Sequence, residues 1–241
     1  MHRNFTLVIS TYLQRSSYNL NTLTNNLFKT NCNLIVIIND DYCRESEVHQ
    51  GKVLTIRRPN RGMNIGAWSA AIPHCSPDSD VIFLQDECEI LSSKFFERYS
   101  ILFSDSSIGM IGESLNTKWD INWRLLRTSS LNYPVTVDNG VSVLATNRVD
   151  LYLSCLRNWN IDPGNSGLHL RSLVWAFRHD VLKKVGRFPE GRNKEECIAA
   201  EIGISRLVKQ LGYRFVQSDQ TPFRFIYHPE WEHHGNCKRR Q

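Results

Sequence analysis

A group of carboxylates follows one of the most apolar stretches of the sequence. Residues 81–84 are all apolar, and three acids, Asp86, Glu87 and Glu89, follow within a few positions. A continuous apolar run is typical of a strand buried on both faces in the middle of a parallel sheet. Open α/β sheets bind ligands at the carboxyl ends of such strands, and clustered oxygen ligands suit Mg²⁺ or Mn²⁺ carrying a substrate phosphate. The pattern therefore predicts either a metal and phosphate site or a solvated acidic turn.

A further carboxylate, Glu201, falls on the apolar stripe of a predicted helix over residues 195–211. That stripe consists of Cys197, Ala200, Ile204, Leu207, Val208 and Leu211. A carboxylate on an inward face is costly unless it is paired or functional. Partial desolvation would raise its pKa toward neutrality, where a general base is most effective. Glu195 and Glu196, in the first turn, have the simpler interpretation of complementing the helix dipole.

Histidines gather near the end of the chain, at His228, His233 and His234. The adjacent pair follows the last predicted strand by a short polar segment. If that segment folds over the acidic strand end, the pair can join a metal site, because imidazole is a common metal ligand. The alternative is that both are surface residues.

The order of predicted elements indicates how these groups are positioned. Residues 5–10, 34–38 and 53–56 read as strands, and Leu20, Leu23, Leu27 and Phe28 recur at helical spacing. A strand, a helix and two further strands are typical of the start of a nucleotide-binding α/β half. Later elements are predicted as helices near 63–71, 95–103, 180–185 and 195–211 and as strands at 108–112, 173–177 and 214–216.

The region from about 115 to 170 has no clear periodicity. It contains several aromatic residues and two arginines, namely Trp119, Trp123, Tyr133, Trp159, Arg124 and Arg127. Such residues can line a groove for an acceptor sugar. The alternative, that they are ordinary core and surface residues, is favoured for each one taken singly.

Composition narrows the class of protein. The 241 residues are 41% hydrophobic, enough for a sizeable core, and 29 basic against 24 acidic residues give a net charge of +5, which is not a nucleic-acid-binding signature. Seven cysteines without a C-x-x-C pair indicate a reducing cytosol. No signal peptide or membrane span is visible. We expect a cytoplasmic protein, with at most peripheral attachment to the inner face of a membrane through residues 238–240.

The order of motifs resembles the family 2-like nucleotide-sugar glycosyltransferases of the GT-A fold, over about residues 5–113 and 170–216. Thr11-Tyr12-Leu13-Gln14-Arg15 is similar to the family's first loop, and Asn60-Arg61-Gly62-Met63-Asn64-Ile65-Gly66 to its N-x-G segment. Leu84-Gln85-Asp86-Glu87 falls on the D-x-D metal motif, with Gln85 and Glu87 in place of its two acids.

The resemblance implies a set of functional residues. A nucleotide-sugar donor, for which a UDP-sugar is the first expectation, would contact Thr11, Tyr12, Arg15, Asp40, Arg61, Asn64, Gly66 and Asp86. Mn²⁺ or Mg²⁺ would be held by Asp86 and Glu87, with His233 and His234 near the donor diphosphate. The donor sugar would pass to a glycan or lipid-linked acceptor, with inversion, in the biosynthesis of a surface polysaccharide.

Two glutamates compete for the role of catalytic base. The family places an E-D pair about eleven residues before a G-Y pair, and Glu201 lies eleven residues before Gly212. The family also places this acid at the start of a helix, which favours Glu196. Both remain candidates.

The expected fold is a single α/β domain of the GT-A type, with a mostly parallel central sheet and helices on both faces. Residues 1–113 would form the nucleotide-sugar-binding half and residues 114–241 the acceptor-binding and catalytic half. A sugar nucleotidyltransferase is an alternative, although residues 10–15 lack the glycine-rich phosphate loop that it needs. A non-catalytic protein that binds sugars or nucleotides is the other alternative, because fold does not prove function.

Overall fold

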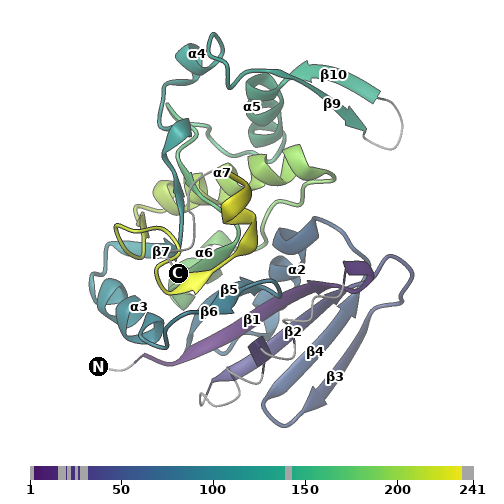
Figure 1. The fold of residues 1–241 in the computed structure, drawn as a ribbon, viewed down its shortest axis with the longest axis vertical. Coiled ribbons are helices and arrows are strands. Elements are labelled where there is room, and N and C mark those ends of the chain that lie inside the picture. Colours follow the sequence, from purple (N-terminus) through teal and green to yellow (C-terminus); the bar gives the residue numbers. More distant parts are fainter. Residues whose placement is uncertain are drawn as a thin grey trace.

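The structure is a computed structural model that describes residues 3–15, 20, 23–24, 27, 32–138 and 143–234. For Arg15, residues 143–144 and residues 232–234 it describes the backbone alone. Figure 1 shows a large twisted sheet in the lower part of the molecule and a smaller helical part above it.

An eight-stranded sheet in the order β13-β7-β12-β5-β1-β2-β4-β3 forms the centre of the fold. β1 (Phe5–Tyr12) pairs in parallel with β2 (Asn33–Asn39) on one side and with β5 (Asp80–Gln85) on the other. β4 (Val53–Arg58) continues the parallel order beyond β2. The apolar runs of the sequence become these strands because their residues are buried on both faces, as parallel strands require.

Two strands break the parallel order. β12 (Val174–Phe177) runs antiparallel between β5 and β7 (Ile108–Gly112), and β13 (Arg214–Gln217) then pairs in parallel with β7. β3 (Ser46–Gln50) forms an exposed antiparallel edge next to β4. The sheet is therefore mostly parallel, which confirms the expected fold class.

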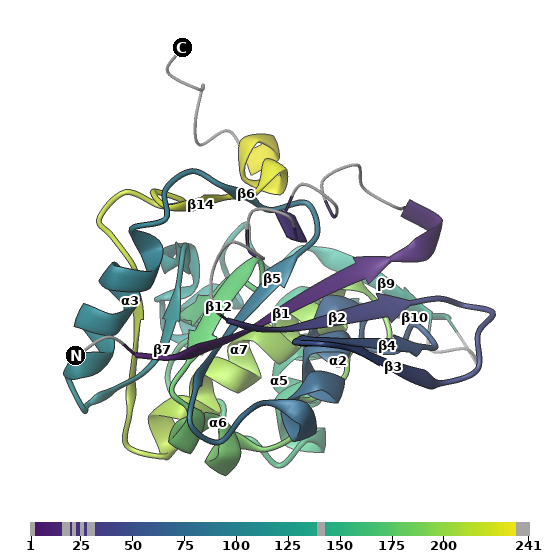
Figure 2. The same cartoon turned by 90° about the horizontal axis from the view of Figure 1, so that it is seen from below.

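Helices cover both faces of the sheet (Figure 2). α2 (Met63–Ala71), α6 (His179–Val185) and α7 (Lys194–Gln210) pack on one face, where Trp68, Val181 and Ala200 join the core around Phe83 and Trp175. α3 (Phe95–Ser104) packs on the other face with Leu23 and Leu27, against Ile82 and Leu84. Alternate residues of β5 thus supply both cores.

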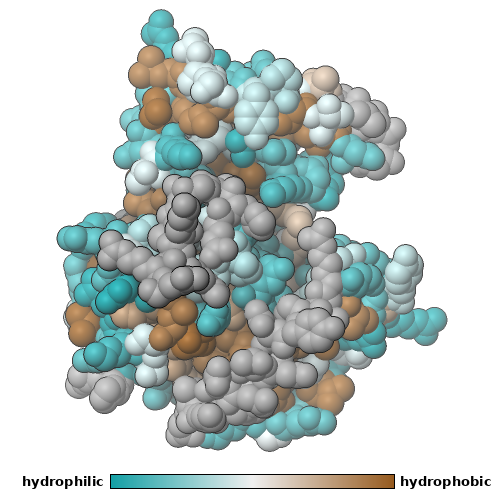
Figure 3. Space-filling view, in the orientation of Figure 1, coloured by the Kyte–Doolittle hydropathy of each residue, from teal (hydrophilic) through white to brown (hydrophobic). Residues whose placement is uncertain are grey.

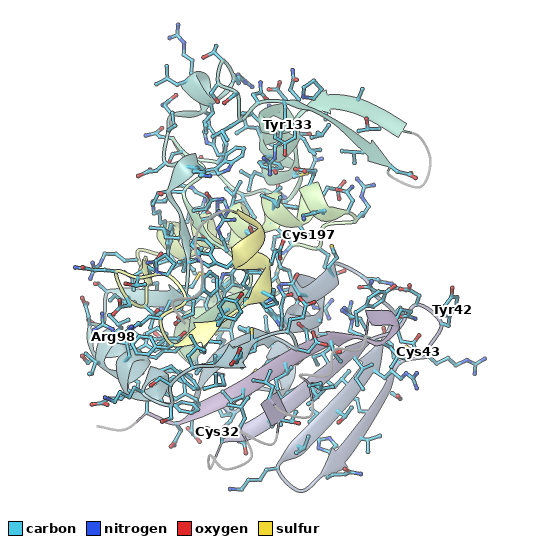
Figure 4. All side chains as sticks on the ribbon, viewed as in Figure 1. Cys32, Tyr42, Cys43, Arg98, Tyr133 and Cys197 are labelled. Atoms are coloured by element: carbon cyan, nitrogen blue, oxygen red, sulfur yellow. The ribbon has the colours of Figure 1, made fainter. Side chains whose placement is uncertain are left out.

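The segment without clear periodicity forms the upper part of Figure 1. It contains α4 (Trp123–Leu126), β9 (Pro134–Asp138), β10 (Val143–Asn147) and α5 (Arg148–Asn158), and α5 packs against α7. Trp119 and Trp123 are buried in this second core, whereas Tyr133, labelled in Figure 4, is 44% exposed. The two tryptophans are therefore core residues, and they do not line a sugar groove.

Short elements connect these layers. β6 (Glu89–Ile90) follows the acidic turn and pairs antiparallel with β14 (Ile226–Tyr227), which brings the segment around residue 226 to that turn. The others are η1 (Leu13–Arg15), η2 (Ile72–His74), β8 (Leu115–Asn116), η3 (Thr117–Trp119), β11 (His169–Leu170) and η4 (Pro229–His234). Within the described ranges, no helix combines the length and the apolar character needed to cross a membrane.

Candidate active site

A pocket opens at the carboxyl ends of β1, β2 and β5. The chain passes from β1 to β2 on one side and later to β5 on the other, so the strand order reverses here. Open α/β sheets bind ligands at such a switch point. The pocket has a volume of about 270 Å³ and is lined by Ser10, Thr11, Tyr12, Asn39, Asn60, Met63, Asn64, Gln85, Asp86 and Glu87. Figure 3 shows the surface hollowed between the upper part, with α5, β9 and β10, and the sheet below.

Asp86 is fixed at the floor of this pocket. Its Oδ2 accepts a hydrogen bond from Thr11 Oγ1 at 2.6 Å, and its backbone N–H donates to the Ser10 carbonyl at 3.0 Å. Asp86 is 8% exposed, whereas the side chain of Glu87 is 50% exposed. The acidic turn therefore presents one buried, oriented carboxylate and one that reaches into solvent.

His228 lies beside the acidic turn, where the pairing of β14 with β6 brings it. Its Nε2 is 3.5 Å from Glu87 Oε2, and its Nδ1 accepts a hydrogen bond from the Glu230 N–H at 3.1 Å. The ring is fully buried, and Nε2 has no hydrogen-bond partner. Burial lowers the pKa of His228 to about 4, so the imidazole is neutral at physiological pH. His228 is one of three histidines near the end of the chain, and nothing in the sequence favours it over His233 and His234.

These side chains fit a divalent ion that arrives with a phosphate. Within the described part of the chain, no group of three His, Cys, Asp or Glu side chains is arranged to hold a metal alone. Asp86 and Glu87 offer oxygens, and His228 offers a buried nitrogen without a partner. Mg²⁺ is usually held by one or two carboxylates together with substrate phosphates. Coordination through His228 Nε2 would require its ring hydrogen to move to Nδ1 and the hydrogen bond from Glu230 to open.

The segment before α2 forms a wall of the pocket. Gly62 has a φ of +71° and Met63 a φ of +51°, and residues other than glycine seldom adopt such positive φ values. A Cβ atom on Gly66 would lie 1.9 Å from the Arg61 carbonyl oxygen, so only glycine fits there. Asn64 lines the pocket and donates to the Ser172 carbonyl at 2.6 Å. Arg61 itself is exposed and does not line the pocket.

The carboxylate of Asp40 is occupied by protein donors. It forms an ion pair with Arg57 at 2.6 Å and accepts hydrogen bonds from Gln14 and from the Tyr42 N–H. Asp40 is 5% exposed and does not line the pocket, whereas the preceding Asn39 does. A nucleobase would reach Asp40 only by displacing one of these donors.

Glu201 lies behind the pocket wall. Its Oε1 accepts from the N–H and the hydroxyl of Ser172, both at 2.6 Å, and its Oε2 is 3.3 Å from His169 Nε2. Burial raises its pKa, but the contacts with His169 and Ser172 together outweigh burial, so the pKa lies below its usual value. The expectation of a raised pKa was therefore wrong. The Ser172 carbonyl accepts from Asn64 and from Gln85, so Glu201 supports the loop that closes the wall.

Glu196 is committed to the start of α7. It accepts three hydrogen bonds from Arg192, through its backbone N–H, Nε and Nη2, and its own N–H is capped by Asn193 Oδ1. It is 4% exposed. Burial raises its pKa, but the contacts with Arg192 and Asn193 together outweigh burial, so the pKa lies below its usual value. Glu195 forms an ion pair with Arg148 at 3.0 Å.

The structure brings together only part of the predicted set. The pocket is lined by Thr11, Tyr12, Asn64, Asp86 and Glu87. The residues outside its lining are Asp40, Arg61, Gly66, Glu196 and Glu201. The side chains of Arg15, His233 and His234 lie outside what the structure describes. The lining also contains Ser10, Asn39, Asn60, Met63 and Gln85, which are not among the predicted contact residues, although Asn60, Met63 and Gln85 stand in the quoted motifs. Except for Met63, these are polar residues at strand ends or in the N-x-G segment, a position that could have singled them out.

Comparison with known proteins places the fold. No family model matches the sequence, and no curated protein matches it either. A mannosyltransferase from Pyrobaculum calidifontis, solved with GDP-Man and Mn²⁺, is 12% identical with a TM-score of 0.52; the match covers 92% of this chain and 56% of that one. Glucosyl-3-phosphoglycerate synthase from Mycobacterium tuberculosis is 13% identical with a TM-score of 0.49 and coverages of 96% and 75%. The chain thus spans little more than half of the mannosyltransferase. Its fold is that of the GT-A nucleotide-sugar glycosyltransferases.

Proposed function

We propose that the protein transfers a sugar from a nucleoside diphosphate sugar to a hydroxyl group of an acceptor. The observation that carries this proposal is the pocket at the switch point of a GT-A sheet, with Asp86 and Glu87 in its lining. Its volume of about 270 Å³ is close to the lower limit for small-molecule sites. That volume suits the nucleotide portion of a donor, while the sugar would extend toward the loop at Ser172.

A divalent ion, Mn²⁺ or Mg²⁺, belongs to this proposal. Asp86 and Glu87 would hold it, and His228 is the nearest nitrogen that could complete the ligand set. When bound, the ion supplies positive charge that stabilises the leaving diphosphate. Thr11 would keep the Asp86 carboxylate oriented through its hydrogen bond. His233 and His234 are proposed near the diphosphate on the sequence resemblance alone.

The remaining predicted residues would hold the nucleotide. Tyr12 and Asn64 line the pocket and would contact the ribose and phosphates. Asp40 lies behind Asn39 and would read the base edge once Gln14 or Tyr42 releases it. We first expect a UDP-sugar, and the mannosyltransferase with GDP-Man makes GDP-sugars the second set to test.

Glu201 is our proposed catalytic base. Its carboxylate contacts Ser172, which belongs to the loop at the pocket wall. The carboxylate of Glu196, in contrast, is bound by Arg192. The carboxylate would take the proton of the acceptor hydroxyl as that oxygen attacks the anomeric carbon and the diphosphate leaves, with inversion. Ser172 and His169 must yield part of their hold on Glu201 for this step. The acceptor would be a glycan or lipid-linked molecule of surface polysaccharide biosynthesis.

One observation favours a second function. Both candidate base carboxylates are held by contacts within the protein, and the pKa of each lies below its usual value. A protein with these features could bind a nucleotide sugar without transferring it.

Calorimetry separates the possibilities. UDP, GDP and their sugar derivatives are titrated into the protein in Mn²⁺, in Mg²⁺ and in EDTA, and release of free nucleotide is then measured with and without candidate acceptors. Metal-dependent binding with release supports the transferase. Binding without release supports the second function, and an absence of nucleotide binding under all conditions rejects both.

A further inference from the structure

Arg171 lies in the loop between β11 and β12, next to Ser172. The loop is anchored on two sides, because the Ser172 carbonyl accepts from Asn64 and Gln85 and the Ser172 N–H donates to Glu201. The Arg171 N–H donates to the Ser114 carbonyl at 3.0 Å. The backbone that carries Arg171 is therefore attached to the wall of the candidate donor pocket.

The guanidinium of Arg171 is half-buried, and no acid whose side chain the structure describes forms an ion pair with it. Its Nε is buried without a hydrogen-bond partner. The other buried or half-buried arginines of the described ranges have ion pairs or hydrogen bonds from their side chains, namely Arg3, Arg58, Arg98, Arg148, Arg178 and Arg206. Of the buried and half-buried arginines in those ranges, Arg171 alone has neither. A buried polar group without a partner is rare, and it calls for an explanation such as an absent ligand.

The acids whose charges act on Arg171, Glu201 and Glu230, are engaged with other partners. The Glu201 carboxylate is held by Ser172 and His169, and Glu230 pairs with Lys194 at 3.6 Å. Burial is the main cause that lowers the pKa of Arg171, the charges of Glu201 and Glu230 oppose the shift, and the positive charge of Arg148 adds to it. The net effect of these surroundings disfavours the cation, and an anion bound from outside would oppose that effect.

The guanidinium is held ready by an aromatic ring. Its Cζ lies 5.8 Å from the centre of the Trp231 ring, which in turn lies 5.0 Å from the ring of Phe223. Trp231 belongs to η4, and its N–H donates to the carbonyl of His228, the residue that faces Glu87. The same segment thus connects Arg171 to the candidate metal site.

The surroundings of Arg171 place it on the acceptor side. The charged groups that act on it, Glu201, Glu230 and Arg148, belong to α7, η4 and α5, which are elements of the second half of the chain. Arg171 does not line the pocket between β1, β2 and β5. A negative group bound at Arg171 would therefore lie beside the donor pocket, separate from the nucleotide.

We propose that Arg171 binds a phosphate or carboxylate group of the acceptor, so that the acceptor of this enzyme is anionic. The planar fork of arginine matches either group through paired hydrogen bonds. This inference rests on the proposed function, because only a transfer reaction has an acceptor. The donor diphosphate carries the same chemistry, and the experiment below separates the two sources.

The test uses the full chain and two matched variants. Arg171→Gln removes the charge at the site, and Arg187→Gln removes one charge from an exposed position outside the pocket. Each protein is titrated with sn-glycerol 3-phosphate and with glycerol, both alone and saturated with UDP and Mn²⁺. The affinity for UDP with Mn²⁺ is measured separately for each protein, and circular dichroism verifies the fold.

We expect the wild type to bind glycerol 3-phosphate more tightly than glycerol in both states. Arg171→Gln should weaken glycerol 3-phosphate binding at least about tenfold, or about 1.4 kcal/mol, with UDP affinity unchanged. Arg187→Gln should change neither. Equal affinity of all three proteins for glycerol 3-phosphate overturns the proposal. So does a loss confined to UDP in Arg171→Gln, because the guanidinium then serves the donor diphosphate.

Failure of the proposed function would look different. In that case the wild type binds no UDP or GDP, yet the titration without nucleotide still compares the three proteins for anion binding. If Arg171→Gln fails to fold, Arg171→Lys is tested in its place, because lysine keeps the positive charge and lacks the planar fork of arginine. The lysine variant should retain part of the affinity for glycerol 3-phosphate, and full retention together with an unchanged preference would contradict paired recognition.

Discussion

The Nε2 atom of His228 lies 3.5 Å from the Oε2 atom of Glu87, which joins the segment after β14 to the acidic turn after β5. A third acid, Glu113, holds this arrangement in place. It is fully buried, and its Oε2 accepts from the backbone N–H groups of Phe225 and Ile226, which begin the return segment. The candidate metal site therefore depends on contacts far apart in the sequence.

Replacement of His228 by alanine should weaken Mn²⁺ binding in the presence of UDP. The substitution removes the imidazole, one of the few polar groups at this site, whether it acts as a metal ligand or through its contact with Glu87. We expect a drop of about tenfold or more, in the range given for supporting groups around metals. Calorimetry with UDP and Mn²⁺ measures it. His74→Ala is the matched control, because His74 lies 3.6 Å from Glu47, on another part of the surface. Equal affinities for the two variants would remove His228 from the site.

Asp86→Asn should abolish metal-dependent nucleotide binding without unfolding the protein. The substitution keeps the size of the side chain and a hydrogen-bonding partner for Thr11, but it removes a charge that would face the ion. The measurement is UDP and GDP affinity in Mn²⁺ and in EDTA, with thermal unfolding as the check on folding. Asp78→Asn, in an exposed loop, is the control. If Asp86→Asn binds as tightly as wild type in Mn²⁺, the acidic turn is only a structural feature.

Local patterns were enough to predict the framework. Residues 81–84 and 34–38 are buried on both faces, so hydrophobicity alone identifies them as central strands. The stripe on α7 is also local, and its residues Ala200, Ile204 and Val208 are fully buried. Such features follow from the periodicity of a single element, which the sequence displays directly.

Long-range pairing could not be predicted in the same way. The antiparallel insertion of β12 between β5 and β7, and the pairing of β14 with β6, join segments without any local sequence signal. The second pairing selects His228 over the other histidines of the tail. For the same reason the stripe on α7 indicated that Glu201 faces inward, but not that Ser172 and His169 lower its pKa.

Glu113 should make stability depend on pH. Burial raises its pKa, although Tyr99 and the backbone N–H groups of Phe225 and Ile226 oppose the shift. The folded state therefore holds this proton more tightly than the unfolded state. Its contribution to the free energy of unfolding is largest below pH 4.5 and is lost as the pH rises through the folded pKa. Glu113→Gln keeps a neutral partner for Tyr99 and should remove this component.

Urea unfolding of wild type and Glu113→Gln between pH 4.5 and 7.5 measures the effect. The difference between the two proteins is the relevant quantity, because His228, with its pKa lowered to about 4, gives both proteins the same opposite slope over the lower part of this range, and that slope cancels in the difference. Glu97→Gln, which changes an acid in the first turn of α3, is the control. Relative to wild type, Glu113→Gln should gain stability as the pH rises. A constant difference across the range would show that Glu113 does not titrate there.

Glu201→Gln should distinguish a role of Glu201 in the transfer step from a role in holding the loop at Ser172. The amide oxygen can still accept from both donors of Ser172, and the amide N–H can donate to His169 Nε2, since His169 Nδ1 lies 2.6 Å from the Gly167 carbonyl and can donate to it. The loop that closes the pocket should therefore remain in place, and the affinity for UDP with Mn²⁺ should stay within about twofold. If Glu201 is the base, transfer to the acceptor should fall about 100-fold or more.

Glu196→Gln is the matched comparison, since it makes the same change one and a half turns earlier on α7. It removes the ion pair with Arg192 at the helix start, so we expect a modest loss of stability with transfer largely retained. Rates of transfer for both variants are measured with matched circular dichroism and donor affinity. Inactivity of Glu196→Gln with an active Glu201→Gln would assign the base to the helix start. Activity in both would leave α7 as a scaffold, and the base would then have to come from another element or from the acceptor itself.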